Sequence, residues 1–239
     1  MLIDALRARG VRFLLHVLAA VSLVALGVTP AQALPLINGD FEAGLSGWDV
    51  FQTDGGETGT VSVVSFETVA GVSSNAAELN VGETTLGTGF QGGGIEQLVS
   101  LGTGTLSVSA DIASFKLPRS GLEPFEDDNH GGLFELLVDD VVRDSFDFDF
   151  VLANQIHRGT LAFSDLVVTA GLHRIAIRVT RPFQNDVTNP LSPTPREYID
   201  NVVLGFKPVE GSTVPEPPAW LLLALGLIPL TRRRAAASA

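Results

Sequence analysis

Between Leu34 and Phe206, short runs of alternating apolar and polar residues are separated by Gly, Asn, Asp and Pro. No sustained helical periodicity interrupts this pattern. Such runs indicate β-strands, and many of them in succession are typical of a β-sandwich. We therefore predict an all-β antiparallel β-sandwich, with strands over residues 48–52, 60–66, 76–81, 95–100, 105–115, 133–138, 141–150, 159–163, 173–180 and 198–206.

Two of these runs also predict which side chains face the core. In residues 175–179 (IAIRV) the isoleucines and the valine alternate with Arg178, so we expect the aliphatic side chains to point inward and Arg178 to point outward. In residues 146–150 (FDFDF) the phenylalanines are predicted on one face and the aspartates on the other. Asp139-Asp140 separates two runs and predicts a tight hairpin, because aspartate tolerates the positive φ of such turns.

The N-terminus has the three-part pattern of a secretory signal peptide. Three arginines precede an apolar stretch over residues 13–28, and Ala31 and Ala33 form an A-x-A cleavage site. We predict that residues 1–33 form a signal helix, which directs the chain to a secretion translocon and is cut by signal peptidase. The alternative is a retained membrane anchor.

The C-terminus combines three features in fixed order: a Pro-Glu-Pro triplet, an apolar run over residues 219–230, and an arginine cluster. Proline keeps the triplet extended and accessible. A helix of twelve residues spans roughly 18 Å, less than the ~30 Å of a bilayer core, and the arginines favour the cytoplasmic side. The residues of the triplet and cluster are Pro215, Glu216, Pro217, Arg232, Arg233 and Arg234.

These features divide the end of the chain into two segments. Residues 208–218 read as a Pro-rich linker that contains the triplet, and residues 219–239 as a short hydrophobic helix with a basic tail. The alternative is an ordinary buried terminal helix with a basic end, but a core helix would be amphipathic.

This tail resembles the sorting signal of PEP-CTERM proteins, which exosortases process in bacteria that make extracellular polysaccharide. The resemblance implies that the tail is held transiently in the inner membrane and is cut near the Pro-Glu-Pro triplet by an exosortase. The domain between the two signals would then reach the cell-envelope surface or the extracellular matrix.

The charge of the exported part excludes one class of partner. The whole chain has 27 acidic and 15 basic side chains, and removing both signals takes away one aspartate and six arginines, which leaves a net charge near −17. Nucleic-acid binding needs a basic face, so we exclude it. The charge suits an extracellular domain or one that takes up divalent cations. There is no cysteine, so the core must hold the fold without disulfides.

Three stretches of residues 34–207 share a second resemblance. The domain opens with residues 38–42 (NGDFE) and Gly47-Trp48, contains GGIEQLVSLGTGTLSVSADI in its middle, and closes with residues 198–204 (YIDNVVL). These stretches resemble the galactose-binding-like jelly roll of many carbohydrate-binding modules and bacterial surface proteins.

The jelly-roll resemblance implies a structural Ca²⁺ site. In such folds the first and last strands commonly pair, and acidic residues of the opening and closing motifs help to hold the ion. Here those residues are Glu42 and Asp200, with Asp40 as a possible neighbour. Ca²⁺ prefers carboxylate and carbonyl oxygens, so the residue types are suitable. The alternative is that Glu42 and Asp200 accept hydrogen bonds from backbone amides near the strand ends.

Two further features are candidate ligand sites. Trp48 could stack on a sugar, but a tryptophan at this place in the motif more often packs inside the sandwich, so we predict that it is buried. Residues 123–130 (EPFEDDNH) form a second candidate cation or ligand loop, whose alternative is a solvated acidic loop.

Catalysis has little support in the sequence. His130, His157 and His173 lack metal-ligand spacing such as H-E-x-x-H, and there is no G-x-S-x-G. Nothing marks out one carboxylate pair for glycoside hydrolysis. No catalytic residue is therefore predicted.

We predict an exported, non-enzymatic protein that acts in adhesion, matrix structure or glycan binding, with acidic exopolysaccharide, bridged by Ca²⁺, as a possible partner. One alternative is a genuine carbohydrate-binding module with a Ca²⁺-dependent ligand. A weaker alternative is a glycoside hydrolase-like enzyme.

Overall fold

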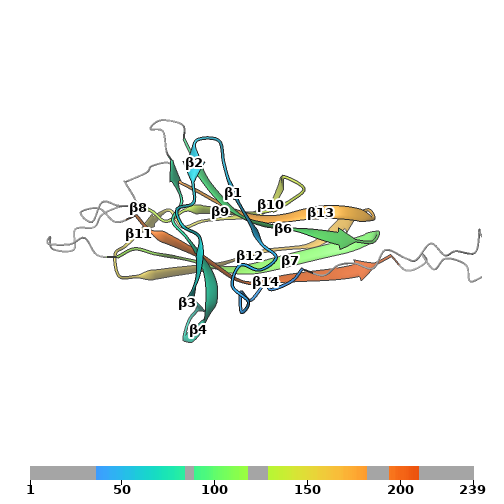
Figure 1. Ribbon diagram of the computed structural model, residues 1–239, viewed down its shortest axis with the longest axis horizontal. Coiled ribbons are helices and arrows are strands. Elements are labelled where there is room, and N and C mark those ends of the chain that lie inside the picture. The colour runs from blue at the N-terminus through green and yellow to red at the C-terminus, as the bar shows by residue number, and fades with distance from the viewer. Residues whose placement is uncertain (1–35, 84–88, 118–128, 182–193, 210–239) are drawn as a thin grey trace, which may run out of the picture.

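The computed structural model describes four parts of the chain and shows two facing antiparallel sheets of five strands each, with two small ribbons (Figure 1). The predicted antiparallel β-sandwich is confirmed. The predicted signal helix, the C-terminal helix and residues 123–128 lie outside the described residues. The described part of the chain contains no helix long and apolar enough to cross a membrane. The described residues are 36–83, 89–117, 129–181 and 194–209.

Each sheet combines one hairpin of consecutive strands with strands that are distant in sequence. The first sheet has the order β1 (Asp49–Gln52), β6 (Gln91–Leu101), β13 (Gly171–Arg181), β9 (Leu133–Val138) and β10 (Val141–Asp147). The second has the order β12 (Ile156–Val168), β7 (Gly104–Phe115), β14 (Arg196–Pro208), β4 (Val72–Leu79) and β3 (Ser62–Val69). The ribbons pair β2 (Gly56–Glu57) with β5 (Gly82–Glu83), and β8 (Asn129–His130) with β11 (Phe150–Val151).

Consecutive long strands often lie in different sheets, as in a jelly roll. Short turns join β6 to β7 and β12 to β13, and each of these turns carries the chain from one layer to the other. Figure 1 shows the two layers lying face to face, with β6 and β13 in one and β7, β12 and β14 in the other. The layers are therefore linked covalently at several points as well as through the core.

The core forms where the alternating aliphatic positions of both sheets meet. Ile95 and Ile177 from the first sheet and Ile112 and Ile199 from the second are fully buried. Within residues 175–179 the isoleucines and the valine are buried while Arg178 makes an ion pair on the outer face, which confirms the predicted alternation. Burial of apolar surface, at about 25 cal/mol per Å², is the main stabilising contribution in such a domain without disulfides.

Trp48 belongs to this core, as predicted. Its side chain is 6% exposed, and its ring centroid lies 5.6 Å from that of Phe41. The indole Nε1–H donates a hydrogen bond of 3.0 Å to the carbonyl oxygen of Asn38, so the polar end of the side chain is satisfied as well. Trp48 is therefore unavailable as a sugar platform.

The hairpin prediction holds, but the prediction for the phenylalanine run is partly wrong. Asp139 and Asp140 have φ of 51° and 65° and join β9 to β10. The single predicted strand 141–150 is instead two strands, because Asp149 adopts a φ of 50° after β10 ends. That residue breaks the alternation, so Phe148 is buried whereas Phe150 is 52% exposed.

Candidate functional site

A polar groove lies at one end of the second sheet. Its volume is about 590 Å³, within the range of roughly 300–1,000 Å³ typical of ligand pockets. It lies where β1 and β4 end and where β3 and β14 begin. All its side chains are polar, and the residues that line it are Gln52, Glu57, Gly59, Thr60, Ser62, Glu78, Asn80 and Arg196.

An ion pair between neighbouring strands forms one wall of the groove. On the outer face of the second sheet, β14 pairs with β4 so that Tyr198 lies opposite Glu78, and Arg196, two residues before Tyr198, is on the same face. The Arg196 Nη1 binds Glu78 Oε1. The arginine side chain is 48% exposed and the glutamate only 14%, so the guanidinium faces solvent while the carboxylate lies beneath it.

Tyr198 supports the same carboxylate from below. Burial is the main factor that raises the pKa of Tyr198, and the charge of Glu78 together with its hydrogen bond raises it further. The phenol therefore stays protonated and donates to Glu78. With Arg196 and Tyr198 both directed at it, the Glu78 carboxylate is held in one orientation at the groove wall.

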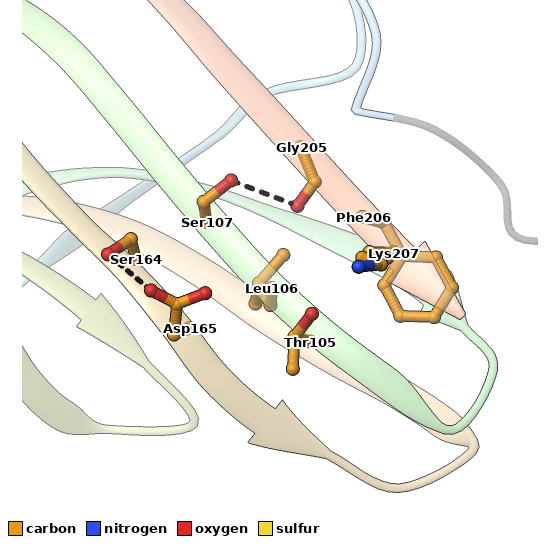
Figure 2. A pocket seen from close by; sticks show the side chains of 8 residues that line it. All are labelled: Thr105, Leu106, Ser107, Ser164, Asp165, Gly205, Phe206 and Lys207. Atoms are coloured by element: carbon orange, nitrogen blue, oxygen red, sulfur yellow. Dashed lines mark hydrogen bonds between the residues drawn. The ribbon is translucent and has the colours of Figure 1, made fainter. Parts of the chain in front are cut away.

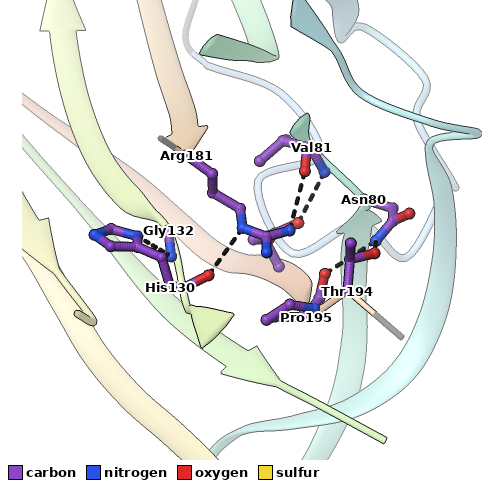
Figure 3. A network of polar contacts seen from close by, with 8 residues as sticks. Asn80, Val81, His130, Gly132, Arg181, Thr194 and Pro195 are labelled. Carbon is purple, nitrogen blue, oxygen red and sulfur yellow. Dashed lines mark hydrogen bonds and ion pairs between the residues drawn. The ribbon is translucent and has the colours of Figure 1, made fainter. Parts of the chain in front are cut away.

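Asn80 is fixed by the chain segment that precedes β14. Its Nδ2 donates hydrogen bonds of 2.7 Å to Thr194 Oγ1 and 2.9 Å to the carbonyl oxygen of Pro195 (Figure 3). Gly59, at a φ of 61°, lies against Asn80, where a β-carbon would approach the Asn80 β-carbon to 3.1 Å. A glycine therefore suits both the backbone conformation and the close approach at this position.

Together, the groove offers carboxylates, amides, hydroxyls and one guanidinium. These groups include both donors and acceptors of hydrogen bonds, and several have their orientation fixed before any ligand arrives. Such a set can recognise a ligand with many hydroxyl groups. None of the eight lining residues is a histidine or a cysteine.

An aromatic cluster on the same outer face is covered rather than open. The rings of Phe66 and Tyr198 are stacked, with centroids 3.5 Å apart and an interplanar angle of 4°, and Phe115 lies 6.2 Å from Phe66. Tyr198 is only 3% exposed. This cluster is a small secondary core and does not present a flat ring to solvent.

The hairpin of β3 and β4 provides this cover. Although β3 and β12 are at opposite edges of the second sheet, Arg158 Nε of β12 donates a hydrogen bond of 2.8 Å to the carbonyl oxygen of Glu67 and its guanidinium pairs with the Glu67 carboxylate. The end of the hairpin therefore crosses the outer face of the sheet. In Figure 1, β3 and β4 run steeply across the direction of β7 and β14.

The opening and closing motifs of the domain meet, although not through paired first and last strands. β1 pairs with β6, and β14 pairs with β4 and β7. The contact instead joins the segment before β1 to β14, where the Val202 amide donates a hydrogen bond of 2.8 Å to the Gly39 carbonyl oxygen. A β-carbon on Gly39 would collide with that region of Val202, which explains the glycine.

The three predicted metal ligands have separate environments. Asp200 is fully buried, and its Oδ2 accepts hydrogen bonds from the hydroxyls of Thr68 and Ser74. Glu42 is exposed and accepts a hydrogen bond of 3.0 Å from Asn75 Nδ2, while Asp40 Oδ1 accepts one of 3.4 Å from the Glu42 amide.

Glu42 and Asp200 thus accept hydrogen bonds from two consecutive residues of β4, Asn75 and Ser74, and have no donor in common. Within the described parts of the chain, no three His, Cys, Asp or Glu side chains gather as a metal-ligand set. The donors around Asp200 are the hydroxyls of Thr68 and Ser74 and the backbone and side-chain amides of Asn201. The Ca²⁺ site stays a prediction.

A buried polar network lies near the groove, inside the sandwich. Arg181 is 2% exposed, and its Nε and Nη1 donate to the carbonyl oxygens of His130 and Val81 at 2.8 and 3.2 Å (Figure 3). Glu197 is fully buried; its Oε2 accepts the Val81 amide at 3.0 Å, and its Oε1 lies 3.8 Å from Arg181 Nη1. Burial raises the pKa of Glu197 to about 8, although Arg181 acts in the opposite direction.

His130 is the described end of the predicted loop 123–130. Its Nδ1 accepts a hydrogen bond of 3.1 Å from the Gly132 amide, and its Nε2 lies 3.2 Å from Asp147 Oδ1. Burial is the main factor that lowers the pKa of His130, although Asp147 acts in the opposite direction. The imidazole is therefore neutral near pH 7, with its proton on Nε2, and it acts as a structural link.

Two half-exposed aromatic rings flank this imidazole. Phe90 is 46% exposed and Phe150 52%, and their ring centroids lie 5.3 and 6.3 Å from that of His130. They are the large aromatic side chains that the described part of the chain leaves exposed. The exposed aromatic surface of the described residues is therefore phenylalanine, not tryptophan or tyrosine.

A second hollow at the other end of β14 is smaller and more self-contained. Its volume is about 290 Å³, and Figure 2 shows that its polar groups pair with each other: Ser107 Oγ donates to the Gly205 carbonyl oxygen at 3.3 Å and Ser164 Oγ to Asp165 Oδ2 at 2.9 Å. Its remaining lining includes Phe206 and the stem of Lys207. The polar groove is therefore the better candidate site.

Sequence reasoning did not single out any residue of the groove. Arg196 lies two residues before the predicted strand 198–206, and the other lining residues come from four separate segments. The buried pair was also missed, although one pattern could have revealed it. Arg181 continues the alternation of Ile175, Ile177 and Val179, which places it on the core face.

Comparisons with known proteins give likenesses of fold at low identity. No family model and no curated protein matches the chain. Among solved structures, TmCBM61 in complex with β-1,4-galactotriose is 18% identical, covers 72% of this chain and 97% of its own, and has a TM-score of 0.44. A cyclase from Fischerella sp. TAU in complex with 4-(1H-indol-3-yl)butan-2-one is 20% identical, with coverage of 75% and 100% and a TM-score of 0.45.

A third structure, the carbohydrate-binding module CBM36 in complex with calcium and xylotriose, is 13% identical, with coverage of 66% and 99% and a TM-score of 0.30. The bound molecules named for these three structures belong to those proteins. For this chain, the class that the structure itself defines is a two-layer antiparallel β-sandwich with jelly-roll connections and a polar groove at one end.

Proposed function

We propose that this protein is an exported, non-enzymatic domain that binds extracellular polysaccharide in the polar groove. The observation that carries the proposal is the prearranged set of Arg196, Glu78 and Tyr198 at the wall of a hollow about 590 Å³ in volume. Sugar hydroxyls both donate and accept hydrogen bonds, and a groove with fixed donors and acceptors suits them. Adhesion or a role in the matrix would follow from such binding.

The test is affinity electrophoresis of the purified domain through gels that contain soluble polysaccharides. Arg196→Ala should restore the mobility seen in a ligand-free gel, because it removes the exposed guanidinium from the groove. Arg178→Ala is the matched control, since Arg178 also pairs with a glutamate across strands, at 2.7 Å from Glu135, but on the first sheet. Equal retardation of the Arg196→Ala variant and the parent protein would rule out the groove as the binding site.

The proposal includes sorting of the chain through its tail. The support is the ordered combination of the Pro-Glu-Pro triplet, the apolar run and the arginine cluster. The mass of the mature protein from producing cells tests it: a C-terminus near Pro217 supports exosortase cleavage, whereas an intact tail through Arg234 contradicts it.

Dependence on Ca²⁺ is the second candidate property of the binding domain. The contact between the opening and closing motifs at Gly39 and Val202 keeps this candidate open. Unfolding of the domain followed in EDTA and in CaCl₂ tests it. A structural ion is supported if Ca²⁺ raises the unfolding midpoint of the parent protein but not that of the Asp200→Asn variant. A midpoint of the parent protein that Ca²⁺ does not change argues against such an ion.

A further inference from the structure

The buried pair of Arg181 and Glu197 is connected to the polar groove through Val81. The Val81 amide donates a hydrogen bond of 3.0 Å to Glu197 Oε2, and the Val81 carbonyl oxygen accepts one of 3.2 Å from Arg181 Nη1 (Figure 3). Side chains of two other strands, β13 and β14, therefore bind both polar groups of this backbone unit. Val81 is fully buried and directly follows Asn80, which lines the groove.

This connection begins where the backbone ladder between β4 and β14 ends. In the described part of the chain, Leu79 and Glu197 are the last paired residues of this ladder at the groove end. Asn80 and Arg196, which line the groove, are the next residues of the two segments and lie beyond the ladder. The hydrogen bond between Val81 and the Glu197 side chain continues the connection past this point. The position of the segment that carries Asn80 thus depends on a side chain of β14.

The side chain of Asn80 is fixed so that it presents an acceptor. Its Nδ2 donates to Thr194 Oγ1 and to the carbonyl oxygen of Pro195, which uses both hydrogens of the amide. Its backbone amide donates a hydrogen bond of 2.9 Å to the carbonyl oxygen of Thr58. The polar atom that the side chain can offer to a ligand is therefore Oδ1, which can accept a hydrogen bond from a sugar hydroxyl.

We infer that Glu197 is a positioning residue of the groove, which holds Asn80 in place through Val81 without touching the ligand itself. A group that is fixed before binding loses less conformational freedom when the ligand arrives, so this support should strengthen binding. The role also accounts for the pair, because a buried arginine–glutamate pair often adds no more stability than apolar residues of similar volume. The inference rests on the proposed function and adds a residue that lies outside the groove lining.

Two substitutions of Glu197 separate its hydrogen bond from its bulk. Glu197→Leu removes the acceptor for the Val81 amide, whereas Glu197→Gln keeps an oxygen that can accept from it. Leu101→Ala controls for a general loss of stability, because Leu101 is fully buried at the opposite end of β6 from the one beside Arg181. If Glu197→Leu does not fold, the double variant Arg181→Met/Glu197→Leu takes its place, since it leaves neither charge alone in the core.

Two measurements are made on each variant, well below its unfolding midpoint. NMR follows the side-chain amide of Asn80, identified as the signals missing from the spectrum of Asn80→Asp. Affinity electrophoresis measures binding to soluble galactan, xylan and alginate. We expect Glu197→Leu to shift the Asn80 signals and to weaken binding about tenfold, the equivalent of roughly one hydrogen bond. Glu197→Gln and Leu101→Ala should leave the signals in place and change the affinity by less than about twofold.

The outcomes distinguish this inference from the proposed function. If the parent protein binds none of the three polymers, the proposed function fails, and unchanged Asn80 signals in Glu197→Leu would overturn the positioning role as well. If the parent binds but Glu197→Leu binds equally tightly, glycan binding stands and the role of Glu197 is overturned. An equal loss of affinity in Leu101→Ala would also overturn it, because binding would then follow the overall stability of the domain.

Discussion

Two arginine–glutamate pairs meet β14 at successive residues, and they differ in almost every physical respect. Arg196 points to the outer face and pairs with Glu78, whereas Glu197 points into the core and pairs with Arg181. The side chains of the first pair are 48% and 14% exposed, and those of the second are 2% and 0% exposed. Because side chains alternate along β14, one arginine–glutamate pair lies on the outer face of the sheet and the other lies in the core.

The difference shows that burial decides the role of an arginine–glutamate pair: a pair on the surface can serve recognition, whereas a buried pair serves the fold. An exposed pair gains little net energy, because water already solvates both groups, so it is free to contact a ligand. A buried pair has lost that solvation, and removing one partner leaves the other uncompensated. The raised pKa of Glu197 reflects this loss of solvation.

The largest expected effect is that of Arg181→Ala. Its removal deletes a fully buried side chain and leaves the carbonyl oxygens of His130 and Val81 without their donor, and should lower the free energy of unfolding by about 3–5 kcal/mol. The measurement is urea unfolding at pH 7. Arg178→Ala, on the same strand but with its pair on the outer face, where the side chains are 31% and 14% exposed, should lower it by only about 1 kcal/mol. Similar losses in the two variants would contradict the comparison.

Next in size is the pH dependence contributed by Glu197. Because burial raises its pKa from 4.5 to about 8, its stabilising contribution is complete below pH 4.5 and is lost as the pH rises through about 8. Glu197→Gln has no such proton to lose. The stability of the parent protein relative to this variant should therefore fall between pH 5 and pH 9, as measured by thermal unfolding. A constant difference across this range would contradict the assignment.

A smaller effect should come from the hairpin between β9 and β10. The two ring nitrogens of His173 lie 2.8 Å from Asp139 Oδ2 and 2.8 Å from the Thr169 carbonyl oxygen. Burial alone lowers the pKa of His173, but these contacts outweigh it and raise the pKa above 6.5. The stabilisation is therefore complete below pH 6.5 and is lost as the pH rises through the raised pKa.

Asp139→Asn tests this link while keeping a residue that tolerates the positive φ of the turn. Histidine titration followed by NMR should show a lower pKa for His173 in the variant. The loss of stability, about 1 kcal/mol at pH 6, should be smaller at pH 9. An unchanged His173 titration would show that Asp139 does not bind the imidazole.

The smallest effect on stability is expected for Arg196→Ala, at most about 1 kcal/mol. The same substitution should abolish retention on polysaccharide gels. A large loss of stability here, comparable with that of Arg181→Ala, would mean that the exposed pair supports the fold and would remove the contrast between the two regions. Thermal unfolding of both variants in one buffer provides the measurement.

The sequence predicted the sandwich because each long strand carries its own alternation. All the predicted strands overlap observed ones, and residues 133–138 match β9 end to end. The short strands β2, β5 and β8 were missed, since two residues cannot show a period. Their pairing depends on contacts between distant segments, which no local pattern encodes.

The site was less predictable for a related reason. The predicted strand 198–206 began after Arg196 and Glu197, so the two residues that define the contrast fell outside it. The groove draws its lining from segments between Gln52 and Arg196 that only the folded sheet brings together. The motifs did correctly indicate that residues 38–42 and 198–204 are associated, through Gly39 and Val202.

The length of β14 sets the distance between the groove and the C-terminal end of the domain. This strand of 13 residues begins at Arg196, which lines the groove, and ends at Pro208, beyond which the chain continues to its C-terminus. At about 3.3 Å per residue the two points are separated by roughly 40 Å. A domain tethered to a surface through its tail would therefore hold the groove at its outermost tip, clear of the surface and directed toward polymer strands in the surrounding medium.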